Sequence, residues 1–195
     1  MMVVGLTGGI GMGKSNAAKV FRRAGMPVFD ADLAVHRLQG RGGRAVRAIG
    51  QAFPGTVTDG GVDRPALRDA VLGDAAALRR LEAIVHPLVR QEERAFLARA
   101  RREGRRVAVL DIPLLFETGG QRRADVVLVV SAPSDVQRHR VGKRRKMSPA
   151  QVEAVIARQM PDREKRRRAD IVVRTGLSRH HTQRQIRRFL RSLAA

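Results

Sequence analysis

Gly8-Gly9-Ile10-Gly11-Met12-Gly13-Lys14-Ser15 directly follows the apolar run Val3 to Leu6 and fits the pattern G-x-x-x-x-G-K-[ST]. In such a stretch, glycines let successive backbone N–H groups turn toward the phosphates of a ligand, and a helix that starts near Gly13 directs its positive end to them. Lys14 adds a positive charge near the β- and γ-phosphates, and the Ser15 hydroxyl is suited to bind Mg²⁺. The sequence therefore predicts a nucleotide site here.

This stretch, called the phosphate loop below, has two alternative interpretations. It could be only a Gly-rich turn between a strand and a helix. It could also be the dinucleotide motif G-x-G-x-x-G, but the sixth residue is Lys14 when counted from Gly9 and Asn16 when counted from Gly11, so the spacing excludes that motif. Because the motif, strand and helix signals agree, the predicted ligand is a nucleoside triphosphate.

The composition is typical of one basic domain. The 195 residues are enough for one sizeable core with a small inserted lobe. Lys and Arg number 39 against 18 Asp and Glu, and the net charge of +21 favours polyanionic partners such as nucleic acids, phosphorylated metabolites or lipid headgroups. However, six Phe with no Trp or Tyr leave few surfaces on which bases can stack. Specific nucleic-acid binding is therefore the weaker interpretation of the charge.

The sequence has no cysteine, which excludes disulfides and thiolate metal sites. Its apolar start has no preceding basic segment, and no apolar run approaches the roughly 18 residues of a membrane-spanning helix. We expect a soluble cytoplasmic protein with no membrane partner, as a monomer or a weak homo-oligomer.

Short apolar runs alternate with long amphipathic stretches, which predicts an α/β fold with a parallel sheet covered on both faces. Strands are expected at residues 3–6, 27–29, 107–110, 126–130 and 171–173. Helices are expected at residues 14–24, 64–72, 74–84, 87–102, 149–160 and 182–193.

Ligands of open parallel sheets bind beyond the carboxyl ends of the strands, so the carboxylates that follow the apolar runs are candidates for function. Asp30 follows the second strand and can equally be the N-cap of the next helix. Asp32 lies further into that helix, and a carboxylate there can accept the proton of a hydroxyl that is being phosphorylated. Asp111 follows the third strand, where it can hold Mg²⁺ through water or serve only the turn at Ile112-Pro113.

A basic run covers Arg140, Lys143, Arg144, Arg145 and Lys146. A charge run of this kind is usually a solvated surface. In an enzyme that transfers phosphoryl groups it can instead be a mobile lid, whose arginines neutralise the transferred phosphate as the site closes.

The residues just described resemble the dephospho-CoA kinase family nearly from end to end. The phosphate loop, Asp30-Ala31-Asp32 and His86-Pro87 match motifs of that family, the last as a helix start. Further matches are Asp63-Arg64 with Leu67, Pro113-Leu114-Leu115 with Glu117, Arg140 and Arg144 in the lid, and Gln159 with Ala169-Asp170. Met12, Asn16 and Thr175 depart from the expected pattern, where a small residue, a Thr and an adenine-side Asn are usual.

The resemblance implies a P-loop NTPase and kinase fold of three layers, with an inserted helical lobe for the substrate and an Arg-rich lid. In one domain, residues 1–35, 105–135 and 168–195 form the core, 36–104 the lobe that binds the CoA moiety, and 136–165 the lid. The implied reaction is ATP-dependent phosphorylation of the ribose 3′-hydroxyl of dephospho-CoA, with Mg²⁺ as cofactor.

The resemblance also implies roles for single residues. Asp32 is the general base, and Lys14 and Arg140 complete the catalytic set. Arg64, His86 and Leu114 bind the acceptor with Asp32, although His86 before Pro87 can also be a simple helix start. Ser15 binds Mg²⁺, with Asp111 acting through water. ATP contacts are expected from Gly9, Ile10, Gly11, Met12, Gly13, Lys14, Ser15, Asn16, Arg144 and Thr175.

Two other functions stay open at this point. One is a different P-loop kinase that acts on a nucleotide or a small metabolite, which the choice of acceptor would separate. The other is a nucleic-acid-binding P-loop protein, suggested by the charge of +21. Its mark would be tight and strongly salt-dependent binding with a defined site size.

Overall fold

The computed structural model describes residues 1–145 and 147–193, except for the side chains of Arg144 and Arg145. The chain divides into two compact units. Unit 1 comprises Met1–Phe29 and Ala100–Ala195, and unit 2 comprises Asp30–Arg99. The sequence placed the inserted lobe at residues 36–104.

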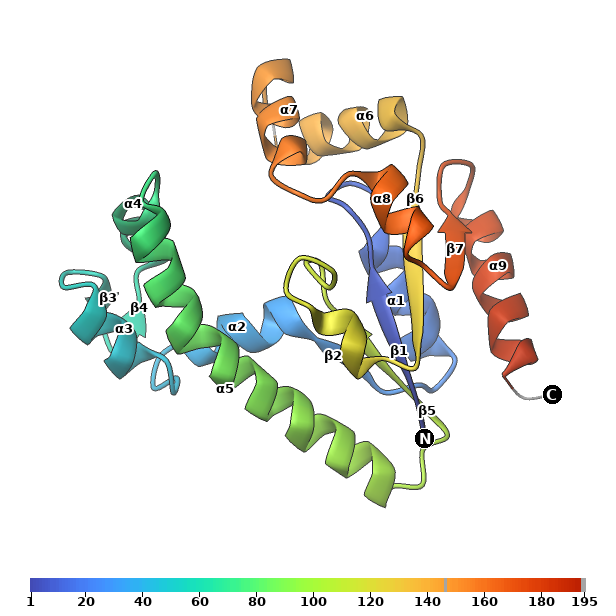
Figure 1. The fold of residues 1–195 in the computed structure, drawn as a ribbon, viewed down its shortest axis with the longest axis horizontal. Coiled ribbons are helices and arrows are strands. Elements are labelled where there is room, and N and C mark those ends of the chain that lie inside the picture. The colour runs from blue at the N-terminus through green and yellow to red at the C-terminus, as the bar shows by residue number, and fades with distance from the viewer. Residues whose placement is uncertain (146, 194–195) are drawn as a thin grey trace. The chain divides into compact units, whose positions relative to one another are not determined.

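A five-stranded sheet is built from β1 (Met2–Thr7), β2 (Val28–Asp30), β5 (Val107–Asp111), β6 (Val126–Ser131) and β7 (Ile171–Arg174). Its strand order is β2-β5-β1-β6-β7 (Figure 1). β1 pairs in parallel with β5 and β6, and β6 pairs in parallel with β7. All five strands were predicted to within one residue at each end, and the parallel arrangement is confirmed.

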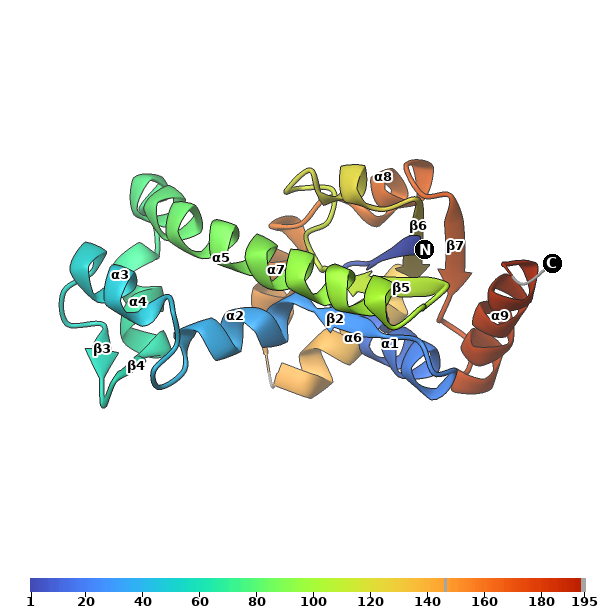
Figure 2. The same cartoon turned by 90° about the horizontal axis from the view of Figure 1, so that it is seen from below.

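Helices cover both faces of the sheet (Figure 2). On one face, α1 (Lys14–Arg23) packs against α9 (Arg179–Ser192). The short helix α8 (Asp162–Arg167) packs on β6 at the opposite face. The main core lies between the sheet and the pair α1 and α9, and includes Val4, Leu6, Phe21, Leu128 and Ile186. Because helices cover both faces of the sheet, its strands must be apolar on both sides. With helices on both faces, the predicted three-layer α/β fold is confirmed.

Unit 2 has its own core, which includes Leu38, Ile49, Phe53, Leu67 and Val85. It contains a β-hairpin whose two-residue turn is Asp59-Gly60, both with positive φ, as hairpin turns of this length require. The sequence analysis did not predict this hairpin. The elements are α2 (Ala31–Gln39), α3 (Val46–Ala52), β3 (Val57–Thr58), β4 (Gly61–Val62), α4 (Arg64–Val71) and most of α5 (Ala75–Arg102).

Helix α5 corrects one prediction. The expected helices 74–84 and 87–102 form a single helix, Ala75–Arg102, with Pro87 inside it. Proline removes one helical hydrogen bond and crowds the carbonyl four residues earlier, which was the reason to expect a break. The apolar residues Leu81, Ile84, Val85 and Leu88 continue along the helix across this point and pack in the core of unit 2. Burial of this face therefore outweighs the missing hydrogen bond.

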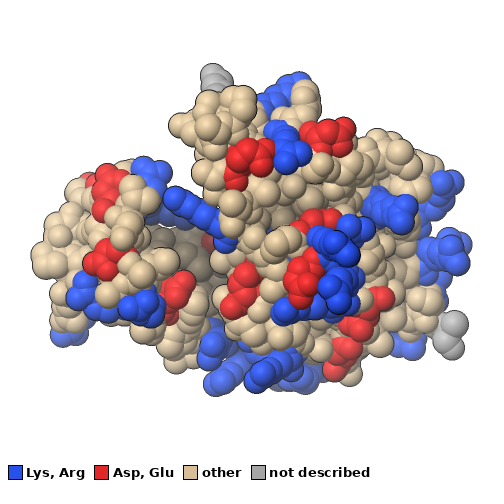
Figure 3. All heavy atoms as spheres, turned by 45° about the horizontal axis from the view of Figure 1, so that its top comes forward, with Lys and Arg blue, Asp and Glu red and all other residues tan. Residues whose placement is uncertain are grey.

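The basic run lies on α6 (Ser134–Arg145), which is followed by α7 (Pro149–Ala157). Lys146 falls outside the described residues. A short 3₁₀ helix, η1 (Gly120–Arg123), precedes β6. Basic side chains are spread over both units and alternate with acidic ones on the face drawn in Figure 3, instead of gathering in one patch. Within the described parts of the chain, no helix combines the length and apolar character needed to cross a bilayer.

Candidate active site at the phosphate loop

The phosphate loop connects β1 to α1 in a conformation that depends on its glycines. Gly11 and Gly13 have φ of 76° and 90°, a region that other residues rarely adopt. A Cβ at Gly8 would lie 2.7 Å from the carbonyl oxygen of Val130, so only glycine fits beneath the loop. Gly13 is the N-cap of α1 and has no side chain with which to cap it. The first N–H groups of α1 are thus left for an anion.

Lys14 and Asp111 form an ion pair with 2.7 Å between Nζ and Oδ1. The two side chains are 15% and 3% exposed, so water screens their attraction only weakly. β1 and β5 are neighbours in the sheet, and Asp111 is the last residue of β5. Asp111 was predicted either as a magnesium-side carboxylate or as a turn residue. The structure brings its carboxylate to the lysine of the phosphate loop.

Ser15 and Asn16 follow in the first turn of α1. Ser15 is exposed, and the Asn16 N–H donates to the carbonyl of Gly13 at 3.0 Å. Met12 is only 2% exposed, and its Sδ accepts the N–H of Ala132 at 3.1 Å. Met12, which departs from the family pattern, therefore has a buried side chain that fills space beneath the loop, while its backbone remains part of the loop.

Thr175 and Arg140 hold the phosphate loop from the side of β7. The buried Thr175 hydroxyl donates to the carbonyl of Met12 at 2.6 Å. Arg140, on α6, donates to the Thr175 carbonyl at 2.7 Å and to the Gly11 carbonyl at 3.3 Å. Thr175 was predicted to contact ATP and Arg140 to belong to the catalytic set, and both touch the backbone of the loop that would hold ATP. The side chain of Arg144, predicted beside them, lies outside the described structure.

Two glutamines that the sequence analysis did not assign to the site hold Ile10. The Ile10 N–H donates to Gln159 Oε1 at 2.7 Å, and Gln137 Nε2 donates to the Ile10 carbonyl at 2.8 Å. Gln159 was noted only as part of the family resemblance. Gln137, three residues before Arg140, faces the same loop from α6, and that helical spacing is the one signal in the sequence that pointed to it.

The loop after β5 is fixed by Lys165 of α8, which is completely buried. Lys165 Nζ pairs with Glu117 Oε1 at 2.8 Å and donates to the Pro113 carbonyl at 3.2 Å. The same carbonyl accepts the hydroxyl of Thr7, the last residue before the phosphate loop, at 2.9 Å. Leu114, predicted to bind the acceptor, is 41% exposed in the loop that these bonds hold.

Burial of Glu117 disfavours its charge, but hydrogen bonds from Lys165 and from backbone N–H groups, including that of Met160, outweigh burial and hold the pKa of this carboxyl below its ordinary 4.5. An ionised group with a lowered pKa stabilises the fold above about pH 4.5, and this contribution disappears as the pH falls through the lower, folded-state pKa. We therefore expect Glu117→Gln to lose stability at neutral pH, and the difference from the wild type to shrink on acidification.

Urea unfolding at a series of pH values from 7 to about 3 measures this difference. The matched control is Glu103→Gln, because Glu103 pairs with Arg105 on an exposed part of the surface. It should follow the wild-type pH profile. A Glu117→Gln variant that tracks the wild type at every pH would contradict the assigned ion pair.

The residues predicted for the acceptor, apart from Leu114, lie in unit 2. Asp30 is the N-cap of α2, and its carboxylate accepts the Leu33 N–H at 3.1 Å, which supports the capping interpretation. Asp32 is exposed in the first turn of α2. The Arg64 guanidinium contacts Nδ1 of His36 at 3.0 Å, a neighbour that the sequence did not indicate. His86 is half-buried inside α5, so the alternative that it starts a helix is wrong.

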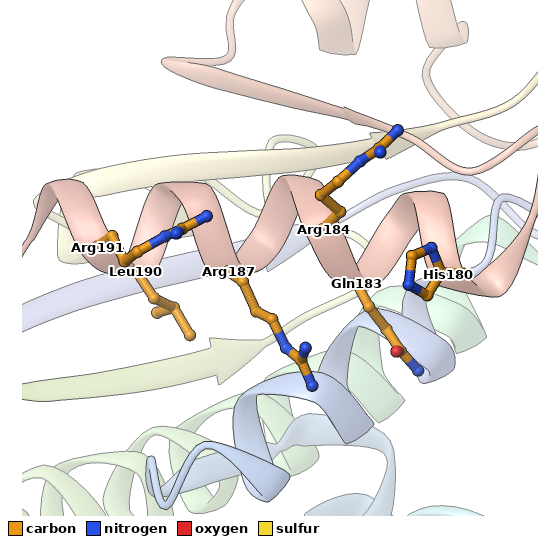
Figure 4. A pocket seen from close by; sticks show the side chains of 6 residues that line it. All are labelled: His180, Gln183, Arg184, Arg187, Leu190 and Arg191. Atoms are coloured by element: carbon orange, nitrogen blue, oxygen red, sulfur yellow. The ribbon is translucent and has the colours of Figure 1, made fainter.

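A surface hollow of about 500 Å³ lies along α9. In Figure 4, Gln183 and Arg187 extend to one side of the helix and Arg184 to the other. The six described residues that line it include none of the predicted site residues, so it is not part of the predicted ATP or acceptor site. They are His180, Gln183, Arg184, Arg187, Leu190 and Arg191.

Comparisons with known proteins show which family this sequence matches. The family model for dephospho-CoA kinase matches residues 2–179. A dephospho-CoA kinase from Mesorhizobium japonicum is 59% identical over 176 residues, which cover 90% of this chain and 88% of the relative. One from Rhodopseudomonas palustris (strain HaA2) is 52% identical over 194 residues, covering 100% and 96%. A crystal structure from Thermus thermophilus has a TM-score of 0.87 at 35% identity, covering 98% and 96%. With the phosphate loop, its lysine and the matching sequence along nearly the whole chain, this protein belongs to the dephospho-CoA kinase family.

Proposed function

We propose that this protein transfers the γ-phosphoryl group of ATP to the ribose 3′-hydroxyl of dephospho-CoA, producing CoA and ADP. The observation that carries the proposal is the contact between Lys14 and Asp111 at the phosphate loop, in a chain of this family. It places the lysine cation of the phosphate loop beside the buried carboxylate of Asp111 at the end of the adjacent strand. This is the arrangement that phosphoryl transfer requires on the donor side.

On the donor side, the N–H groups of Gly11, Gly13, Lys14 and Ser15 would face the phosphates, with the Lys14 side chain beside them. The donor set suits Mg²⁺, because the Ser15 hydroxyl and the Asp111 carboxylate are oxygen ligands and Mg²⁺ prefers oxygen, retaining water and phosphate in its shell. When bound, Mg²⁺ neutralises charge on the phosphates. Ser15 would hold it directly and Asp111 through water. In the structure Lys14 Nζ lies 2.7 Å from Asp111 Oδ1, so the carboxylate already stands beside the loop that would hold the phosphates.

On the acceptor side, Asp32 would accept the proton of the 3′-hydroxyl as the oxygen attacks the γ-phosphorus. The bond from that phosphorus to the oxygen bridging to the β-phosphate breaks, and ADP leaves with this electron pair. Arg64, His86 and Leu114 would hold the CoA moiety. Support for these acceptor roles comes from the family motifs.

Arg140 is proposed to stabilise charge on the transferred phosphoryl group from the lid, together with Arg144. We expect Arg140→Ala to lower kcat about 10²-fold, the usual loss for a charge-stabilising donor. Steady-state kinetics with both substrates measures this, with Arg184→Ala on the exposed face of α9 as the control for lost positive charge. If only the KM for ATP rises, Arg140 contributes to ground-state binding alone, in keeping with its bonds to Gly11 and Thr175.

The proposed function is tested by ADP release from Mg-ATP with and without dephospho-CoA. Adenosine, AMP and shikimate serve as comparison acceptors, because a different P-loop kinase would favour one of them. We expect stimulation by dephospho-CoA alone and a product phosphorylated on the 3′-oxygen. Equal or greater stimulation by another acceptor would overturn the assignment.

We also propose that the enzyme works in the cytoplasm as a monomer or a weak homo-oligomer, without a membrane or a specific nucleic acid as partner. Both substrates are water-soluble, and few aromatic residues are present for base stacking. Binding to DNA or RNA should be weak and should vanish near physiological salt.

A further inference from the structure

The peptide groups on both sides of Ile10 are held by side chains from outside the phosphate loop. Gln159 Oε1 accepts the Ile10 N–H at 2.7 Å, and Gln137 Nε2 donates to the Ile10 carbonyl at 2.8 Å. Gln137 is 7% exposed, so water competes little for its amide. These two residues are called the glutamine pair below. Both bonds fall within the normal range for hydrogen bonds between uncharged groups.

The glutamine pair determines where the neighbouring peptide groups point. In a trans peptide the N–H points away from the carbonyl of the same planar group. The bond from Gln137 to the Ile10 carbonyl therefore turns the N–H of Gly11, in the same plane, to the opposite side. In the same way, the bond from the Ile10 N–H to Gln159 turns the Gly9 carbonyl away, and this carbonyl accepts the Met12 N–H at 3.1 Å.

Close packing around the phosphate loop restricts how its peptide groups can be oriented. A Cβ at Gly11 would lie 2.7 Å from a methyl carbon of Val141, and one at Gly9 would lie 3.3 Å from Gln137 Nε2. α6 thus packs directly on the loop at Gly11. The loop cannot shift toward α6, so its peptide planes depend on the side chains that bond them.

The glutamine pair spans the basic segment. Gln137 lies near the start of α6, and Gln159 follows α7, so the two residues bracket the run from Arg140 to Lys146. If that segment moves far enough to break either hydrogen bond, the corresponding peptide group of Ile10 is no longer held. The conformation of the phosphate loop and the position of the segment are thereby linked.

We infer that Gln137 and Gln159 are positioning residues for ATP, which orient the Ile10 peptides so that the Gly11 N–H faces the nucleotide phosphates. The inference rests on one part of the proposed function, namely that the phosphate loop binds ATP. The glutamines need not touch the nucleotide, because they act through the backbone of Ile10.

The test uses Gln137→Leu and Gln159→Leu, which remove the hydrogen bond at nearly constant size and without new charge. The chain offers a matched control in Gln185, which bonds both the N–H and the carbonyl of Arg174, at 3.0 Å and 2.8 Å. Gln185→Leu breaks the same kinds of bond at an exposed site on α9. Calorimetry gives the Kd for Mg-ATP, steady-state kinetics give kcat and KM for each substrate, and thermal unfolding gives Tm.

We expect each variant of the glutamine pair to weaken ATP binding about three- to tenfold, the effect of one hydrogen bond between uncharged groups. The KM for ATP should rise while the KM for dephospho-CoA stays as in the wild type. In the double variant the loss should be smaller than the product of the two single losses, because both bonds act on Ile10. Gln185→Leu should change Tm without changing the Kd for ATP.

An unchanged Kd for ATP in both single variants, with a fall in Tm like that of Gln185→Leu, would overturn the inference and leave the glutamines a purely structural role. Equal rises in both KM values would also overturn it. A wild-type protein that binds ATP but does not phosphorylate dephospho-CoA would refute the proposed function, and the Kd values would still test the glutamine pair. A wild-type protein that does not bind ATP would refute both.

Discussion

Asp32→Asn is expected to lower kcat by about 10²- to 10⁴-fold, the range for loss of a group that transfers a proton in the transition state. Asn is similar in size but cannot accept the proton of the 3′-hydroxyl. The affinity for ATP should be unchanged, because the phosphates are assigned to the phosphate loop and not to α2. Single-turnover kinetics with saturating substrates, together with calorimetric ATP binding, separate the two effects.

The matched control for this prediction is Asp74→Asn. Asp74 accepts the N–H groups of Ala76 and Ala77 in an exposed turn, and Asn also serves well at such a position. The control should therefore retain both stability and turnover. If Asp32→Asn turns over at the wild-type rate, Asp32 has no part in proton transfer, and Asp30 becomes the next carboxylate to test.

Lys14→Met is expected to lower kcat about 10²- to 10³-fold, comparable to the loss of a preorganised donor, and to weaken ATP binding as well. The substitution removes the charge assigned to the β- and γ-phosphates. It also removes the partner that lies 2.7 Å from the nearly buried Asp111, so the variant should lose stability. Kinetics, calorimetry and urea unfolding measure the three effects.

A second substitution separates stability from catalysis. In Lys14→Met with Asp111→Asn, the carboxylate charge is gone too, so stability should recover while turnover stays low. Lys19→Met, on the exposed face of the same helix, controls for the loss of one positive charge. If Lys14→Met loses stability but keeps the wild-type turnover, the catalytic role of Lys14 is wrong.

The sequence predicted the features that depend on local patterns. The phosphate loop is readable because its glycines, lysine and serine must stand at fixed spacing, and the strands are readable because both faces of the sheet are apolar. The dipeptide Asp59-Gly60 is typical of a two-residue hairpin turn, although the hairpin was not predicted. Pro87 misled the prediction, since its cost to a helix is local while the apolar face that compensates it is packed in the core of unit 2.

The partners of the site residues could not be predicted from such patterns. Lys165 looks in the sequence like one more cation among many, yet it is completely buried against Glu117 and Pro113. Gln137 belongs to no motif and Gln159 only to the family resemblance, and their contacts with Ile10 span 127 and 149 residues of sequence. Among 39 Lys and Arg residues, composition gave no means to single out those that hold the site.

By itself the sequence determined that a phosphate-binding loop joins the first strand to the first helix, and that a carboxylate stands at the end of another buried strand. Only the tertiary structure decided that Asp111 meets Lys14 and that two distant glutamines hold Ile10. The reason is physical. Backbone conformation and burial follow from neighbouring residues, whereas a contact between side chains depends on which strands become neighbours in the sheet and which helices pack upon it.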